Sequence, residues 1–97
     1  MNEEIANAML IKRARKEILR SLRLFYPSDI NLRSLQVSVA DIEEHHLKVD
    51  LSYLIDKGYV VWTNREPNQN WKDRNYRITA AGMERLDKIV VDPALEP

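Results

Sequence analysis

Apolar residues recur at steps of three and four along the first quarter of the chain. The members of this series are Leu10, Ile11, Ala14, Ile18, Leu22 and Phe25. This spacing places them on one face of a helix, which the sequence predicts from about Glu3 to Phe25. Pro27 and Asp29 end it, because the residue before a proline is pushed out of the α region. A helix of this length spans roughly 33 Å, so we expect the part before Leu10 to project, to fray or to pack on a second subunit.

Between residues 31 and 39 the apolar positions are few and their spacing changes. Leu32 and Leu35 suit one or two helical turns, whereas Val37 and Val39 alternate as residues of a strand do. The sequence therefore predicts a short second helix that is followed by an extended link.

A third helix follows, and both of its ends carry signals. Asp41 and Glu44 have the spacing of a capping box, in which the first side chain accepts from first-turn amides and the second reaches back. The apolar stripe of this helix consists of Leu47, Leu51, Leu54 and Ile55. Gly58 follows Lys57 and supplies the left-handed residue at which helices commonly end. We therefore expect a helix from the capping box to Lys57.

The remaining sequence predicts two strands and a closing helix. The runs at 59–63 and 75–78 have strand character, and the polar residues 64–73 between them form the tip of a hairpin. Thr79 is a good N-cap for the last helix. The predicted buried face of that helix consists of Met83, Leu86, Ile89 and Val90. Residues 91–97 are predicted to be a flexible tail.

Two strings within this order resemble the winged-helix family, a helix-turn-helix variant with a β-hairpin wing. Residues 51–60, Leu-Ser-Tyr-Leu-Ile-Asp-Lys-Gly-Tyr-Val, are similar to the family's Leu-x-x-Leu-x-x-x-Gly-(Leu/Tyr)-Val exit from the recognition helix. Residues 76–86 are similar to its Tyr-x-(Leu/Ile)-Thr-x-x-Gly-x-x-x-Leu start of the closing helix. Gly58 turns the chain into a strand, and Gly82 lets the last helix approach its neighbour closely. The sequence also resembles small phage- and prophage-encoded winged-helix proteins.

The resemblance, which covers about residues 10–90, implies an α+β, mainly α, fold in a single domain at residues 1–90. Its parts are a three-helix core, a two-stranded β-hairpin wing and a C-terminal helix. Most winged-helix domains bind double-stranded DNA: the third helix enters the major groove, and the wing contacts the backbone or the minor groove. Such proteins are often homodimers built through their terminal helices, and Ile5 and Met9 on the long first helix offer a dimer surface.

Composition narrows the classes of function. The 15 basic and 15 acidic residues give a formal net charge of zero, which argues against a binder whose affinity depends on a large positive total. The chain has no cysteine, which excludes disulfide scaffolds, thiolate zinc sites and thiol chemistry. The apolar runs are far too short for a membrane span, and the start Met-Asn-Glu-Glu shows no secretion signal. The sequence therefore predicts a cytoplasmic protein without a membrane partner.

The residue pattern gives no indication of catalysis or of a metal site. His45 and His46 are adjacent, so on a helix they point about 100° apart and cannot hold one metal ion together. His46 and Asp50 would make half a site, for which the sequence offers no third ligand. Two isolated glycines cannot form a phosphate-binding loop. We therefore expect a protein that is not an enzyme and needs no cofactor.

The charges around the third helix depart from the pattern of a DNA-reading helix. Between Asp41 and Lys57, five acidic residues stand against two basic residues, Lys48 and Lys57. Such a surface repels phosphates rather than neutralising them. An ordinary solvated helix face is the alternative interpretation.

Basic residues gather in two other places. One set lies opposite the apolar stripe of the first helix and consists of Lys12, Arg13, Lys16, Arg20 and Arg23. The other surrounds the hairpin and consists of Arg65, Lys72, Arg74 and Arg77, with Trp71 among them. Arginines enter minor grooves and an indole stacks on bases, which indicates a role in DNA binding. The alternatives are that the first set only solubilises its helix and that Trp71 packs across from Trp62.

A protein-binding surface is the competing hypothesis. Ile42, Val49 and Tyr53 form an apolar line beside the acidic face of the third helix, and such lines often bury against a neighbouring element or subunit. The sequence thus predicts a small DNA-binding transcriptional regulator that contacts DNA through its first helix, Lys48 and the hairpin. The alternative is a winged-helix module that binds a protein through its third helix and does not bind DNA.

Overall fold

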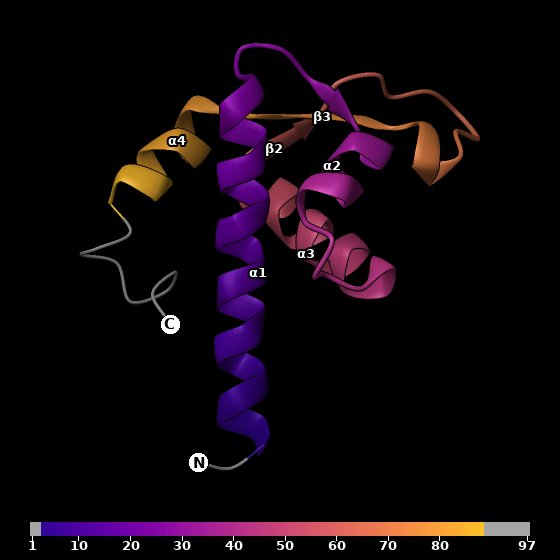
Figure 1. Cartoon of the computed structure of the whole chain (residues 1–97). Helices are drawn as coiled ribbons and strands as arrows, with labels where there is room; N and C mark the ends of the chain where they lie inside the picture. Colours follow the sequence, from indigo (N-terminus) through magenta and orange to yellow (C-terminus); the bar gives the residue numbers. More distant parts are fainter. Residues whose placement is uncertain (1–2, 89–97) are drawn as a thin grey trace.

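The computed structural model describes residues 3–88, with side chains from residue 8 onward, and these form a mainly helical α+β fold. The elements are α1 (Glu3–Phe25), β1 (Ile30–Asn31), α2 (Leu32–Ser38), α3 (Glu44–Asp56), β2 (Val60–Trp62), the 3-10 turn η1 (Trp71–Asp73), β3 (Asn75–Ile78) and α4 (Ala80–Asp87). Figure 1 shows α1 running through the middle of the molecule, with α4 on one side and α2 and α3 on the other. The helix α1 and the strand β3 have the predicted bounds.

The sheet has three antiparallel strands in the order β1-β3-β2, rather than the two strands of the predicted hairpin. Val61 of β2 lies opposite Arg77 of β3, and Ile30 of β1 lies opposite Tyr76. The prediction missed β1 because two residues, Ile30 and Asn31, are too few for an alternating pattern to show. Their strand character comes from pairing with β3, which is distant in the sequence.

The core lies where α1 meets α3, α4 and the sheet. Its buried apolar side chains are Ile18, Leu19, Leu22, Ile30, Leu32, Leu35, Val39, Leu47, Leu51, Leu54, Val60, Tyr76, Ile78 and Leu86. The predicted stripes of α1 and α3 therefore supply the centre of the core, as expected from their helical spacing.

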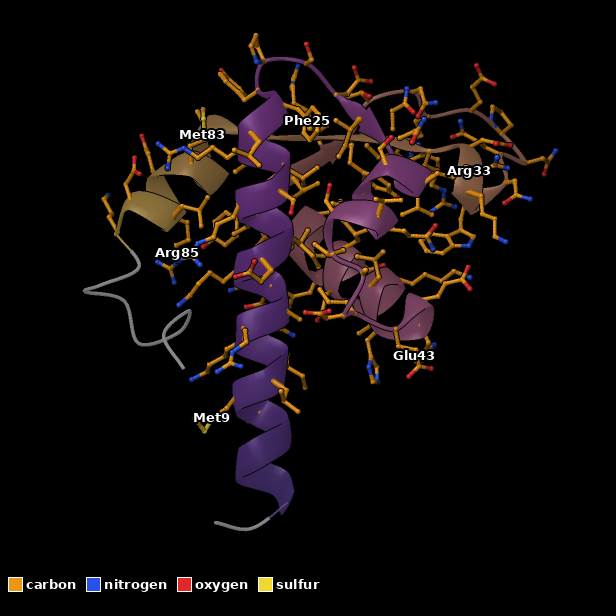
Figure 2. The ribbon with its side chains drawn as sticks, viewed as in Figure 1. Met9, Phe25, Arg33, Glu43, Met83 and Arg85 are labelled. Atoms are coloured by element: carbon orange, nitrogen blue, oxygen red, sulfur yellow. The ribbon has the colours of Figure 1, made fainter. Side chains whose placement is uncertain are left out.

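The predicted stripe of α1 is wrong at its two ends. Leu10 is 59% exposed and Ile11 is 44% exposed, and Phe25 is exposed as well. The reason is length: the molecule extends 42 Å along its longest axis but only 26 and 22 Å along the others. Figure 2 shows Met9 on the part of α1 that projects from the body and Phe25 near its opposite end. Projection is one of the three alternatives that the sequence left open for the helix start; the side chain of Ile5 lies outside the described residues.

The segment between α2 and α3 also differs from the prediction. Val37 belongs to α2 and is exposed, and Val39 lies in the turn that follows, so no extended link is present at these positions. The N-cap of α3 is Glu43, whose side chain makes no capping hydrogen bond. The predicted capping box at Asp41 and Glu44 is therefore wrong, because Asp41 lies in the turn, too far from the first helical amides to accept from them.

The junction between α3, β2 and α4 forms as predicted. Gly58 adopts a left-handed φ of +79° after α3, and Thr79 caps α4 by accepting from the backbone N–H of Gly82 at 3.0 Å. The Thr79 hydroxyl also donates to the carbonyl oxygen of Gly58 at 2.6 Å. One side chain thus joins the end of α3 to the start of α4. In α4, Leu86 is buried, while the predicted contacts of residues 89–90 and the tail at 91–97 lie outside the described residues.

Replacing Thr79 with alanine is expected to lower the free energy of unfolding by about 1 kcal/mol, because α4 loses its cap. Thr79→Ser keeps the hydroxyl and should restore most of the loss. Chemical denaturation of the two variants beside the parent chain measures both values. Equal stability of the alanine variant and the parent would show that the cap contributes nothing.

Candidate nucleic-acid interface

The predicted DNA-contacting residues lie on two separate surfaces. We call the first the basic stripe; it lies on α1 and consists of Lys12, Arg13, Lys16, Arg20 and Arg23. We call the second the helix–loop surface; it lies on α3 and on the segment between β2 and β3, and it consists of Lys48, Arg65, Trp71, Lys72 and Arg74. The basic stripe reaches α4 through the contact of Arg23 with Asp87, whereas η1 packs on α2. In Figure 1 α4 and α2 lie on opposite sides of α1, so the Arg23 end of the basic stripe and the η1 part of the helix–loop surface lie on different sides of that helix.

Part of the charge on the basic stripe is neutralised within the fold. Nη1 of Arg20 lies 3.2 Å from Oε1 of Glu17, and Nη1 of Arg23 lies 2.6 Å from Oδ1 of Asp87. These exposed pairs contribute little to stability, but each places a carboxylate beside a guanidinium that DNA would need. Arg13 is exposed on the same side of the helix. The stripe lies beside the buried face rather than directly opposite it, because Lys12 and Lys16 are half-buried, and its net positive charge is lower than its sequence suggests.

On the helix–loop surface, a contact joins α3 to the segment that follows β2. Nζ of Lys48 lies 4.2 Å from the centroid of the Trp71 ring, within the range of a cation–π interaction. Trp71 is partly buried against the core, and η1 is capped by Asn70, whose side chain accepts from the backbone N–H of Lys72 at 2.9 Å. The alternative prediction placed Trp71 across from Trp62; in the structure Lys48 of α3 lies over the Trp71 ring. Helix and loop form one continuous surface at this point.

Trp62 organises the two arginines of the same surface. Cζ of Arg74 lies 3.9 Å from the centroid of its ring, and Cζ of Arg65 lies 5.1 Å from it. The indole N–H donates to Oε1 of Gln69 at 3.0 Å, which fixes the ring. Burial raises the pKa of the neighbouring Tyr76 hydroxyl, and Arg74 opposes that shift. Both guanidinium groups are thus held near the indole instead of moving freely in water.

The acidic character predicted for α3 is reduced because Asp50 is buried. Its Oδ1 accepts from Nε of Arg15 at 3.3 Å, and Cζ of Arg15 lies 3.6 Å from the centroid of the Tyr53 ring. Burial raises the pKa of Asp50, and the charges of Arg15 and of His46 oppose that shift. Asp41 precedes the helix. Fewer acidic side chains therefore face solvent from α3 than its sequence suggests.

Sequence reasoning missed this pair, although one signal was present. Asp50 lies three residues after Leu47 and four residues before Leu54, on the face that the apolar stripe marks as buried. A carboxylate at such a position needs a partner. The spacing does not identify the partner, because Arg15 lies on another helix 35 residues away.

The residues predicted for protein binding do not form one exposed line. Val49 is 51% exposed, whereas Ile42 and Tyr53 are partly buried and pack against the core. Arg15 and Lys57 also lie over the Tyr53 ring. An exposed apolar surface at this position is therefore limited to the surroundings of Val49.

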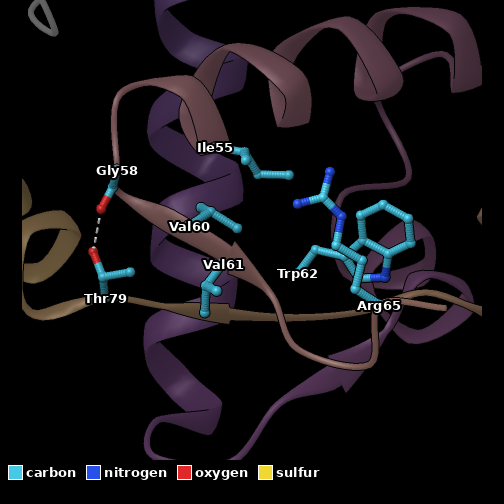
Figure 3. Close-up of a pocket in the computed structure, with 7 residues that line it drawn as sticks. All are labelled: Ile55, Gly58, Val60, Val61, Trp62, Arg65 and Thr79. Atoms are coloured by element: carbon cyan, nitrogen blue, oxygen red, sulfur yellow. Dashed lines mark hydrogen bonds between the residues drawn. The ribbon is translucent and has the colours of Figure 1, made fainter.

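A groove that was not predicted lies between the end of α3 and β2 (Figure 3). Its volume is about 340 Å³. The lining residues are Ile55, Gly58, Val60, Val61, Trp62, Arg65 and Thr79. Figure 3 shows the side chains of Val60 and Trp62 on the side of β2 that faces Ile55. The side chain of Val61 lies on the other side of the strand. Arg65 closes one end of this mainly apolar groove.

Comparisons with known proteins identify no relative. No family model matches the chain, and neither the curated proteins nor the solved structures include a match. Among the described residues, no group of three or more histidine and acidic side chains is placed to hold a metal ion. Within residues 3–88, no helix has both the length and the apolar character that crossing a membrane requires.

Proposed function

We propose that this chain is a winged-helix protein that binds double-stranded DNA through its helix–loop surface. The order of elements supports the winged-helix assignment: α2 and α3 are joined by a short turn, and β2 and β3 flank a polar loop. In this arrangement α3 is the helix that enters the major groove, and the loop contacts the neighbouring backbone.

The contact between Lys48 and Trp71 is the observation that carries the proposal. A helix-turn-helix module positions its second helix by contacts of neighbouring groups with phosphates. Here the loop places Trp71 beside Lys48 on the exposed side of α3, and Lys72, the next residue of the loop, is exposed. The basic loop therefore adjoins the basic residue of α3, as a phosphate-binding surface requires.

The withdrawal of Asp50 from solvent removes one objection to this proposal. The exposed residues of α3 include one basic side chain, Lys48, and two acidic ones at its ends, Glu44 and Asp56. This surface is less acidic than the sequence of the whole segment, in which five acidic residues stand against two basic ones. The surface therefore no longer opposes the approach of phosphates as strongly as the sequence indicated.

The basic stripe is assigned no contact with the same duplex. Its Arg23 end lies on the α4 side of α1, whereas η1 packs on α2, and Arg20 and Arg23 already have carboxylate partners. The transcriptional role and the homodimer that the family resemblance implies remain predictions that depend on DNA binding being found.

A duplex-binding assay with matched charge removals tests the proposal. Polarisation with a mixed pool of short duplexes, measured between about 50 and 200 mM salt, should show affinity that falls steeply with salt. Lys48→Ala and Lys72→Ala should each weaken binding and reduce the slope of log affinity against log salt by about one. Arg13→Ala removes one charge from the basic stripe and should leave both values unchanged.

Two outcomes would contradict the proposal. Failure to bind duplex at the lowest salt would exclude DNA binding by this surface. A loss in Arg13→Ala as large as that in Lys48→Ala would assign binding to the basic stripe instead.

A further inference from the structure

The outer edge of β2 has no neighbouring strand among the described residues. The strand order is β1-β3-β2, so β2 pairs with β3 on one side only. Such an edge presents backbone N–H and C=O groups that another extended segment can pair with. Proteins use this property to bind peptides by adding a strand to a sheet.

The register of the sheet identifies which backbone groups face the free edge. Two backbone bonds flank the pairing of β2 with β3: Thr63 N–H to the Asn75 carbonyl at 2.9 Å and Thr79 N–H to the Tyr59 carbonyl at 3.0 Å. Hydrogen-bonded pairs alternate along antiparallel strands, so Val61 and Arg77 form the hydrogen-bonded pair between them. Val60 and Trp62 therefore direct their N–H and C=O groups toward the free edge.

The groove beside this edge supplies two different surroundings for side chains. At one end Ile55 and Val60 form an apolar wall. At the other end Arg65 lies beside Trp62, with its guanidinium 5.1 Å from the ring centroid. Side chains of an added strand that lie opposite Val60 and Trp62 point to the same face of the sheet as those two residues. Figure 3 shows that this face looks toward Ile55 and Arg65.

We propose that the β2 edge binds an extended peptide segment, antiparallel to β2, that carries an acidic residue followed two positions later by an apolar residue. The acidic side chain lies opposite Trp62 and pairs with Arg65. The apolar side chain lies opposite Val60 and packs on Ile55. This function does not depend on DNA binding, although it uses Arg65, which also belongs to the helix–loop surface.

Charge argues for such a peptide rather than a second copy of this chain. In a symmetric antiparallel pair centred on Val61, Val60 of each copy would lie opposite Trp62 of the other. The strand β2 is Val-Val-Trp and offers no acidic side chain to Arg65. A peptide with an acidic residue at that end supplies one, and opposite charges on facing strands attract.

Hydrogen exchange and chemical shifts of the backbone amides test the proposal in the absence of DNA. The probe is the blocked peptide Ser-Glu-Thr-Val-Ser, titrated into the full ¹⁵N-labelled chain. The amides of Val60 and Trp62 should exchange fast in the free chain and become protected on addition of the peptide. The amide of Val61, which is already paired with β3, should be protected in both states.

Matched peptides and variants separate strand addition from adventitious contact. Methylation of the peptide nitrogens of its glutamate and valine should weaken binding about tenfold, because the edge hydrogen bonds are lost. Arg65→Glu should weaken binding about fivefold, and a peptide with lysine in place of glutamate should restore it. Arg33→Glu, which changes an exposed charge on α2, should have no effect.

Three results would overturn the proposal. One is equal binding of the methylated peptide, and another is stronger binding of the reversed order Ser-Val-Thr-Glu-Ser. The third is protection of Val60 and Trp62 that rises with protein concentration in the absence of peptide, which would identify a second copy as the occupant.

Discussion

Replacing Gly82 with alanine is expected to lower the free energy of unfolding by about 3 kcal/mol. A Cβ at this position would collide with the carbonyl oxygen of Tyr59 and lie 2.8 Å from Cγ1 of Ile78. The carbonyl belongs to the backbone at the start of β2, so it cannot move without disturbing the sheet. In an ordinary helix the same change stabilises by up to about 1 kcal/mol. A loss of stability in Gly82→Ala would therefore indicate the close contact with Tyr59.

Gly58→Ala is the matched control, because it adds the same methyl group at the other glycine. No atom lies within 4 Å of a Cβ at Gly58, but its φ is +79°. The expected loss is therefore only the left-handed strain, about 1 kcal/mol. Thermal and chemical denaturation of both variants measure the difference. A Gly82→Ala variant as stable as the parent chain would contradict the close contact between α4 and the start of β2.

Replacing Arg15 with methionine is expected to lower the free energy of unfolding by about 3 kcal/mol at neutral pH. The change leaves the carboxylate of Asp50 buried without its guanidinium partner, and it removes the stacking of Arg15 on Tyr53. Arg13→Met makes the same chemical change at an exposed position and should have little effect. The double variant Arg15→Met, Asp50→Asn should be more stable than Arg15→Met alone, because the uncompensated charge is gone.

The loss in Arg15→Met should depend on pH in a defined direction. Burial raises the pKa of Asp50 in the folded chain above its ordinary value of 3.8. The folded state then binds the proton more tightly than the unfolded state, so protonation of Asp50 stabilises the fold. The stabilisation that protonation of Asp50 gives is complete below pH 3.8, and it is lost as the pH rises through the pKa of Asp50 in the folded chain.

Without Arg15 the pKa of Asp50 in the folded chain is higher still. The pH range over which protonation of Asp50 stabilises the fold therefore extends further toward neutral pH. The stability difference between Arg15→Met and the parent chain should therefore shrink as the pH is lowered from 7 toward 3.8. Denaturation curves at several pH values measure it. A difference that stays constant over this range would show that the charge of Asp50 is not what Arg15 compensates.

The parts of the fold that sequence predicted are those fixed by local chemistry. The turn at Gly58 needs a residue that tolerates a positive φ, and the cap at Thr79 needs a side-chain oxygen at the helix start. Both signals lie within a few residues of the structure they determine. The same holds for Gly82, where the close approach was expected and is found.

The parts that sequence did not predict depend on distant segments. The strand β1 exists because Ile30 pairs with Tyr76, and Asp50 is acceptable in the core because Arg15 reaches it from α1. Leu10 has the helical spacing of a core residue and is exposed, because α1 is longer than the body it packs on. Periodicity identifies a face, but it does not show where the surface that covers that face ends.

The candidate site shows the same division. The sequence identified the basic residues on α1 and around the hairpin, but it treated them as parts of one DNA-contacting set. The structure separates them, because Arg23 contacts α4 while Lys48 contacts Trp71 of the loop. The groove beside β2 has no local signal, since Ile55 and Arg65 come together only when α3 and β2 pack.

The most direct test of the proposed function is to map chemical-shift changes on the ¹⁵N-labelled chain during titration with duplex DNA at low salt. The proposal predicts the largest changes at the amides of Lys48, Trp71 and Lys72, with small changes at Arg13 and Lys16. Changes concentrated on Arg13 and Lys16, or no changes at all, would contradict it.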